Sequence, residues 1–287
     1  MQEFAPDSFY LDSEMMGPGH IGISLLRSGG EFAIVDTAMA PAASRIIDSI
    51  QALGGSPEAV TAIFVTHVHL DHAGGAGSLA ELCPNAKVIV HPRGVRHMVD
   101  PSRLIEGTRA VWGEQNYSKF FGEVRPVPER QAVEADFSTE VRFGDRTFQI
   151  FDTPGHAKHH YSLFEPASGV LFPGDTLGLA YDGQSVFPSS SPVQFDPDAL
   201  KESVRLFANL GACCAAIAHF GILTDVEGAC DQMLTRIDGF VDACQNSDSE
   251  NELREKLLQL LPSSVRSMYE LDAQINAQGL MHWKASQ

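Results

Sequence analysis

Basic residues, long apolar runs and paired cysteines are scarce in this chain of 287 residues, and each scarcity excludes a class of protein. Lysine and arginine total 20 against 37 acidic residues, and a net charge of −17 would repel a nucleic-acid backbone. No window approaches the roughly 18 to 20 uninterrupted apolar residues of a membrane span. The first residues are acidic, unlike a secretory signal. We therefore expect a cytoplasmic protein without nucleic-acid or membrane partners.

The cysteines are odd in number and show no C-x-x-C spacing. They are Cys83, Cys213, Cys214, Cys230 and Cys244. This pattern favours free thiols in a reducing compartment over a disulfide framework. The remaining composition, 44% apolar and 20% charged, is that of a globular protein.

The apolar patterning predicts an α/β fold. Runs typical of strands at 21–26, 31–36 and 59–65 surround an amphipathic stretch at 41–53. A second block of β-rich runs lies between residues 140 and 175.

The C-terminal part of the sequence is mostly helical in character. From residue 197 onward only one apolar run, ending at His219, has the pattern of a strand. Beyond residue 246 the pattern predicts two helices, the second capped by Ser263 or Ser264.

The stretch "THVHLDHAGG", residues 66–75, concentrates polar groups directly after an apolar run. His67 and His69 lie two apart in what should be extended backbone, so both side chains can point the same way. Asp71 and His72 turn toward them as the next helix begins. Such residues are costly to bury unless something pairs with them, and the spacing therefore predicts a metal site.

Three further candidate ligands each follow an apolar strand and stand beside a turn residue. They are His156 in "DTPGHAKHH", Asp175 in "LFPGDTL" and His219 in "AIAHFG". Each alone is weak, because such residues are common at turns. Strand ends on one side of a sheet are nevertheless where an α/β protein builds its site.

Taken in order, "THVHLDH", "PGH", "GD" and a late "H" resemble the metallo-β-lactamase superfamily over about residues 10 to 220. The resemblance implies an αββα sandwich, two sheets face to face with helices outside. It also implies a first metal on His67, His69 and His156. A second would be held by Asp71, His72 and His219, with Asp175 bridging both.

The same resemblance implies a hydrolase with a small-molecule substrate. Imidazole and carboxylate ligands suit zinc, which we favour, and also iron or manganese. Two divalent ions about 3.5 to 4 Å apart can share a water and lower its pKa toward about 7. We therefore expect a metal-bound hydroxide to attack an ester-like bond, a thioester or a lactone. The bridging Asp175 is similar to that of hydroxyacylglutathione hydrolases and lactonases.

Other polar residues near these motifs have two interpretations each. His159 and His160, in "AKHHYS", either support the site or face solvent, and His160 joins Asp71 and Asp175 in the expected catalytic set. Asp36 either resembles an aspartate that supports a ligand or caps a turn. The remaining histidines lack a partner at ligand spacing and are expected to be structural: His20, His91, His97 and His282.

We expect residues 1–246 to form the catalytic domain and residues 247–287 a helical extension packed on it. The apolar stripe of that extension, which includes Tyr269, either roofs the active site or only packs against the sandwich. Two other functions remain open, a di-iron redox or oxygen-binding protein on the same ligands and a non-catalytic signalling protein. A homodimer is also left open.

Overall fold

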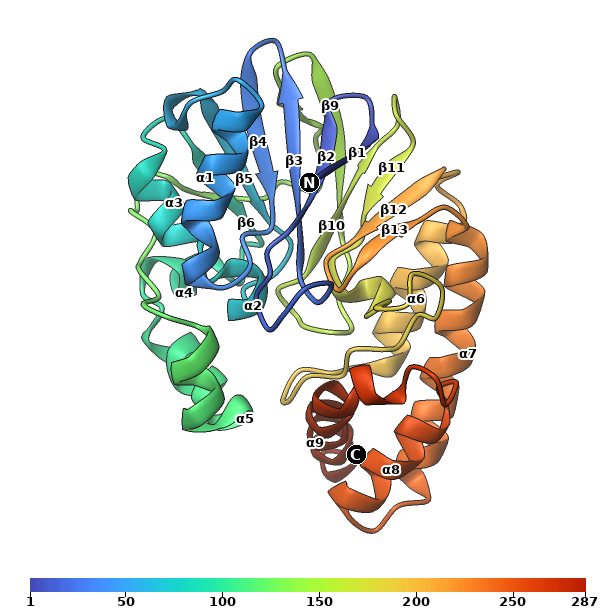
Figure 1. The fold of residues 1–287 in the computed structure, drawn as a ribbon. Coiled ribbons are helices and arrows are strands. Elements are labelled where there is room, and N and C mark those ends of the chain that lie inside the picture. The colour runs from blue at the N-terminus through green and yellow to red at the C-terminus, as the bar shows by residue number, and fades with distance from the viewer.

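A computed structural model describes residues 1–287, and it contains two β-sheets face to face with helices on both outer sides (Figure 1). The first sheet has seven strands in sequence order, antiparallel from β1 to β4 and parallel from β4 to β7. Its strands are β1 (Gln2–Ala5), β2 (Ser8–Asp12), β3 (Gly22–Ser28), β4 (Glu31–Val35), β5 (Val60–Val65), β6 (Lys87–Val90) and β7 (Ala132–Glu134).

The second sheet has six strands in the order β13-β12-β11-β10-β9-β8. All neighbours are antiparallel except β11 and β12, so β9, β11 and β12 run in the same direction. Its strands are β8 (Val141–Phe143), β9 (Arg146–Asp152), β10 (Tyr161–Glu165), β11 (Val170–Phe172), β12 (Cys214–Ile217) and β13 (Gly221–Leu223).

The helices divide between the two outer sides of the sandwich. Those that share a core with the first sheet are α1 (Ala43–Ala52), α2 (Leu70–Ala73), α3 (Ala76–Leu82), α4 (Val95–Val99) and α5 (Ser102–Phe120). Those that share a core with the second are α6 (Pro197–Ala208), α7 (Val226–Gln245), α8 (Glu250–Gln259) and α9 (Glu270–Ala285). Short 3₁₀ helices are η1 (Ala40–Ala42), η2 (Pro57–Ala59), η3 (Gly174–Leu177) and η4 (Arg266–Met268).

Three apolar layers hold the sandwich together. Between the sheets, the rings of Phe64 and Phe148 lie with centroids 5.8 Å apart within a core of 17 buried residues. Each outer layer, between a sheet and its helices, contains 31 buried residues. The αββα architecture expected from the sequence is confirmed.

Local sequence explains where several elements begin. Strand β5 is apolar on both faces because one face packs on the helices and the other on the second sheet. Helix α6 starts with Pro197, and the side chain of Asp196 accepts hydrogen bonds from the N–H groups of the first turn. Ser249 caps α8 in the same way.

The prediction that Ser263 or Ser264 caps the last helix is wrong. Both serines are exposed, and α9 begins only at Glu270, after η4. The residue before α9 is Tyr269, which is buried and whose hydroxyl accepts a hydrogen bond from the N–H of Tyr181 at 2.9 Å rather than capping the helix. A tertiary contact of this kind leaves no capping signal in the sequence.

The C-terminal helices share one core with α6, α7 and the second sheet. Leu257, Tyr269 and Leu280 are buried there together with Phe187. Helix α9 lies so close to the loop before α6 that a Cβ at Gly279 would overlap the carbonyl oxygen of Ser190. The division at residue 246 stays a prediction. No helix is both long and apolar enough to cross a lipid bilayer.

Candidate metal centre

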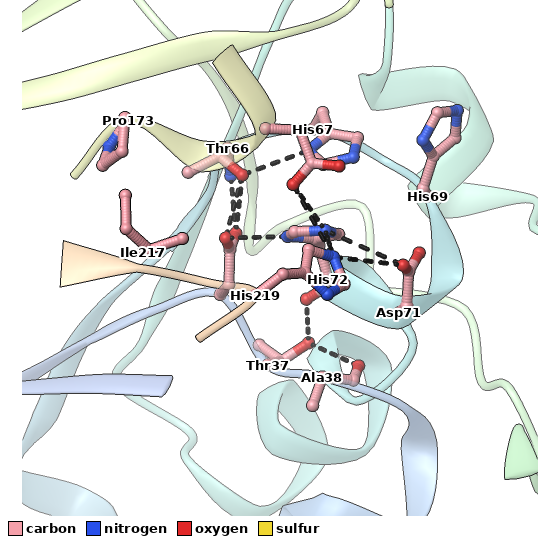
Figure 2. Close-up of polar contacts among 12 residues, drawn as sticks. Thr37, Ala38, Thr66, His67, His69, Asp71, His72, Pro173, Ile217 and His219 are labelled. Carbon is pink, nitrogen blue, oxygen red and sulfur yellow. Dashed lines mark hydrogen bonds and ion pairs between the residues drawn. The ribbon is translucent and has the colours of Figure 1, made fainter. Parts of the chain in front are cut away.

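The first part of the site runs from the end of β5 into α2. It carries His67, His69, Asp71 and His72, and the side chains of Asp71 and His72 point toward His219 (Figure 2). This segment is held by Asp36 at the end of β4. The carboxylate of Asp36 accepts hydrogen bonds from the Thr66 N–H at 2.8 Å and from Nδ1 of His72 at 3.0 Å. Nε2 of His72 is therefore free to face the site.

The second part of the site comes from three loops of the other sheet. His156 follows β9, Asp175 lies in η3 after β11, and His219 follows β12. Because these strands run in the same direction, their carboxyl ends meet at one edge of the sandwich, where β5 also ends. The fold thus brings all seven predicted ligands together.

The ligand atoms form three overlapping groups, within each of which they lie no more than 4.8 Å apart. These groups are His67, His69 and His156; His67, His72 and Asp175; and Asp71, His72 and His219. Asp175 lies between the two outer groups. Its Oδ1 is 3.2 Å from Nε2 of His72, and its Oδ2 is 3.6 Å from Nε2 of His156.

The donor set fits divalent cations. Nδ1 of His69 is 2.9 Å from Nε2 of His156, and the Nε2 atoms of His72 and His219 are 3.0 Å apart. Nitrogens that share a zinc ion at about 2.0 to 2.1 Å lie roughly 3 to 3.5 Å from each other. Nε2 of His67 and Oδ1 of Asp175 are buried without a hydrogen-bond partner, which a cation would supply. The fold and these groups indicate divalent metal binding.

The pKa values of the histidines shift differently in the group that contains His69 and in the group that contains His219. Burial, reinforced by neighbouring imidazoles, lowers the pKa of His67 and His69 well below the usual value, and burial also lowers that of His156. These three rings are therefore neutral, which is the form of imidazole that binds a metal.

In the other group the carboxylates dominate. Burial alone would lower the pKa of His72 and His219, but Asp175 and Asp71 outweigh it and raise both. Burial alone would likewise raise the pKa of Asp71 and Asp175, but the adjacent histidines hold both below their usual range. The centre thus combines three neutral imidazoles, those of the first group, with two ionised carboxylates.

A family model described as the metallo-beta-lactamase superfamily matches residues 16–219. The chain belongs to the metallo-β-lactamase superfamily. A metallo-beta-lactamase fold-containing protein of Sulfurisphaera tokodaii is 28% identical over 179 residues, which are 61% of this chain and 66% of that protein. A hydroxyacylglutathione hydrolase of Legionella pneumophila is 28% identical over 215 residues, 75% of this chain and 65% of that enzyme. The chain thus spans about two thirds of these relatives.

A solved structure supports the same assignment. A metallo-beta-lactamase family protein from Thermus thermophilus superimposes with a TM-score of 0.76 at 22% identity. The match covers 98% of this chain and 94% of that one, so it includes the C-terminal helices. At this identity the likeness concerns the fold.

The neighbouring residues His159 and His160 take different positions relative to the metal centre. His160 is fully buried, and its Nε2 accepts a hydrogen bond from the Asp175 N–H at 3.0 Å, while Nδ1 lies 2.9 Å from Oγ1 of Thr153. His160 does not line the cleft over the metal centre, whereas His159 does. The catalytic role predicted for His160 stays a prediction, and this placement favours positioning of Asp175 over contact with substrate.

The cleft over the metal centre has a volume of about 790 Å³. Helix α5 and helix α9 form opposite walls, and the loop of residues 188–194 lies between them (Figure 1). Apolar side chains on these walls include Val111, Trp112, Ile275 and Met281. The cleft is therefore large enough for a small molecule and is bounded partly by the C-terminal helix.

The lining of the cleft includes residues that sequence reasoning missed. Asp272 accepts a hydrogen bond from the Tyr181 hydroxyl at 3.3 Å, and burial raises the pKa of Asp272 to about 6. Tyr269, for which the sequence leaves a roof and plain packing open, is buried in the core and does not line the cleft. His97 and His282, expected to be structural, do line it. No sequence pattern marks these positions, because they depend on how α5 and α9 pack.

Proposed function

We propose that this protein is a binuclear metal-dependent hydrolase of an ester-like bond, a thioester or a lactone, with zinc as its metal. The observation that carries the proposal is the position of Asp175. Each of its oxygens faces a different ligand group, at 3.2 Å from His72 and 3.6 Å from His156. A carboxylate so placed can bind two cations at once, and a pair of cations is one established way to activate water for hydrolysis.

Two divalent ions held there would lower the pKa of a water molecule and polarise the bond under attack. The residues of this chain fix the geometry. Asp36 accepts the Nδ1 proton of His72, and the carbonyl oxygen of Ser189 accepts that of His156 at 2.9 Å. Both interactions select the tautomer that turns Nε2 toward the cations.

Asp71 is the carboxylate best placed to exchange protons with substrate. Its side chain is 17% exposed and borders the cleft, whereas that of Asp175 is 3% exposed. Hydrolysis adds the oxygen of water to the acyl carbon, breaks the C–S or C–O bond and delivers a proton to the leaving thiol or alcohol. Asp71 lies where it can take up and return that proton.

No cysteine competes for the role of nucleophile. None of the five lines the cleft, and burial raises the pKa of Cys83 and Cys230 to about 12. Thiolates are the reactive form of cysteine, so these side chains are inert at neutral pH. Relatives named hydroxyacylglutathione hydrolase also favour hydrolysis as the reaction class.

The test is hydrolysis of a panel of acyl thioesters and lactones by the purified protein, before and after removal of metal with a chelator. We expect turnover that a chelator abolishes and added zinc restores. The absorption spectrum of the protein as purified distinguishes a zinc site from a di-iron site, because an oxo-bridged di-iron site absorbs in the near ultraviolet and zinc does not. No turnover of any substrate, together with an oxo-iron band, would overturn the proposal.

A further inference from the structure

A second cavity, of about 860 Å³, adjoins the cleft over the metal centre. The two share His97, His159 and Gln194 in their walls, so these three residues lie at the junction between them. The second cavity is also tied to the metal centre through the backbone. Lys158, on its wall, lies two residues beyond the candidate ligand His156, and its N–H donates to Oε1 of Gln194 at 2.8 Å.

Three cationic side chains line this cavity without pairing to a carboxylate. They are Arg93, Arg96 and Lys158. The guanidinium group of Arg93 donates to the carbonyl oxygen of Lys158 at 3.1 Å, and that of Arg96 donates to Nε2 of His97 at 3.2 Å. The charges of these groups are thus left available, although the chain as a whole carries −17.

The positive charge continues into the main cleft. Arg103, on α5, lines the cleft beside His97, and burial together with the charges of Arg96 and Arg103 lowers the pKa of His97. Cations from both cavities therefore converge on the junction. Two carboxylates, Glu129 and Glu134, also line the second cavity, and neither forms an ion pair with the three cations.

We propose that this second cavity is an anion-binding subsite, so that the substrate is an ester-like molecule bearing a carboxylate or phosphate group. The reacting bond lies at the metal centre, and the anionic group lies against Arg93, Arg96 and Lys158. Guanidinium groups match the paired oxygens of either anion, and unpaired cations attract one in an otherwise acidic protein. This inference rests on the proposed hydrolase function for its reaction and on the cationic wall for its substrate class.

The test compares three series of S-acetyl thioesters whose thiols end in a hydroxyl, a carboxylate or a phosphate, each with linkers of two to six methylenes. At one linker length we expect kcat/KM for an anionic substrate to exceed that of the neutral one by about tenfold or more, chiefly through KM. The preferred anion identifies which group the subsite takes. Equal values for neutral and anionic substrates at every length would overturn the proposal.

Variants of the cavity wall test whether the preference for anionic substrates depends on its cations. Arg96→Gln and the double variant Arg93→Gln/Lys158→Gln should reduce the ratio of anionic to neutral kcat/KM toward one. The matched control is Arg142→Gln, an exposed arginine on β8 that lines neither cavity, and it should keep the wild-type ratio. An anion preference that survives in the wall variants contradicts the assignment.

A binding measurement separates this inference from the hydrolase proposal. The free thiols that end in a hydroxyl, a carboxylate or a phosphate are titrated into the protein by calorimetry at two salt concentrations. If no thioester is hydrolysed but an anionic thiol binds more tightly than the neutral one, and this preference decreases in Arg96→Gln, the subsite stands and the reaction is wrong. If thioesters are hydrolysed but all three thiols bind alike, the subsite is wrong.

Discussion

One loop, residues 67–72, supplies four of the seven candidate ligands, whereas His156, Asp175 and His219 come from three loops of the other sheet. The two contributions are also held differently. A single aspartate, Asp36, braces the contiguous loop from within its own sheet. The dispersed ligands depend on distant elements, including α9. One half of the centre is therefore a local structure, whereas the other half depends on the packing of the whole fold.

The bracing of the dispersed half can be followed from α9 to the metal centre. Oδ1 of the buried Asn276 accepts hydrogen bonds from the N–H of Ser190 at 2.5 Å and from its hydroxyl at 2.9 Å. Nδ2 of Asn276 donates to the carbonyl oxygen of Pro188 at 2.9 Å. The residue between them, Ser189, accepts the hydrogen bond from His156. Helix α9 therefore positions a candidate ligand as well as forming a wall of the cleft.

Substitution of Asp175, which lies between the two halves of the centre, should have the largest effect on metal content and activity. In Asp175→Asn an amide replaces the carboxylate that faces both ligand groups, so a negative charge between two cations is lost. We expect loss of at least one metal ion per chain and a decrease in hydrolysis of more than about 100-fold. Metal analysis and initial rates measure both. The control is Asp198→Asn, an exposed carboxylate on α6, and an Asp175→Asn protein that keeps two ions would refute the bridging assignment.

Substitution of Asp36, which holds the contiguous loop, should have the next largest effect, on metal affinity. Asp36→Asn keeps the shape of the side chain and tolerates the positive φ of 57° at this position, but it weakens the acceptor of the His72 Nδ1 proton. Loss of such a partner typically costs about 10- to 100-fold in metal affinity. Competition with a chromophoric chelator should show this loss for one ion of the two. Unchanged affinity for both would mean that Asp36 only caps a turn.

Substitution of Asn276, which holds the loop beside His156, should have a smaller effect on metal affinity and a measurable effect on the free energy of unfolding. Asn276→Ala leaves the buried Ser190 N–H and the Pro188 carbonyl without partners, so we expect unfolding to become easier by about 1 to 3 kcal/mol. Denaturant titration measures this. Asn251→Ala, at an exposed position of α8, serves as the matched control. Equal stability of the two variants would remove α9 from the account of how His156 is held.

A substitution in the cleft wall that α9 forms should have the smallest effect, and only on substrate preference. Met281→Ala enlarges the cleft without touching a candidate ligand, so it should shift the ratio of kcat/KM between bulky and small substrates by about tenfold or less. Metal content should stay constant. Met268→Ala, at an exposed methionine outside the cleft, is the control. A uniform loss across all substrates with a lower Tm would instead indicate a role in packing.

The contiguous ligands were predictable from the sequence because His67, His69, Asp71 and His72 are close in the chain and follow an obvious strand. The dispersed ligands were each weak signals, and only the resemblance to a family put them in one site. The central strands of both sheets were predictable from their apolar runs. The strands that sequence reasoning missed, β1, β2, β7 and β13, have three to five residues each, too few for a clear period.

The walls of the cleft were not predictable. Asp272 and Met281 lie on a helix whose apolar pattern indicates burial but not which residues face a cavity. Tyr269 had two interpretations, roof or packing, and it is buried in the core, where its hydroxyl accepts a hydrogen bond from the backbone N–H of Tyr181, 88 positions earlier. Contacts over such separations depend on the packed fold, and no local pattern encodes them.

The position of Asp175 between two ligand groups predicts how many ions the wild-type chain binds. Metal-free protein would be titrated with zinc and the metal-to-chain ratio measured by native mass spectrometry. If the contiguous and dispersed halves form one centre around Asp175, the ratio rises to two ions per chain and stops there. Saturation at a single ion, or no retained ion, would contradict it.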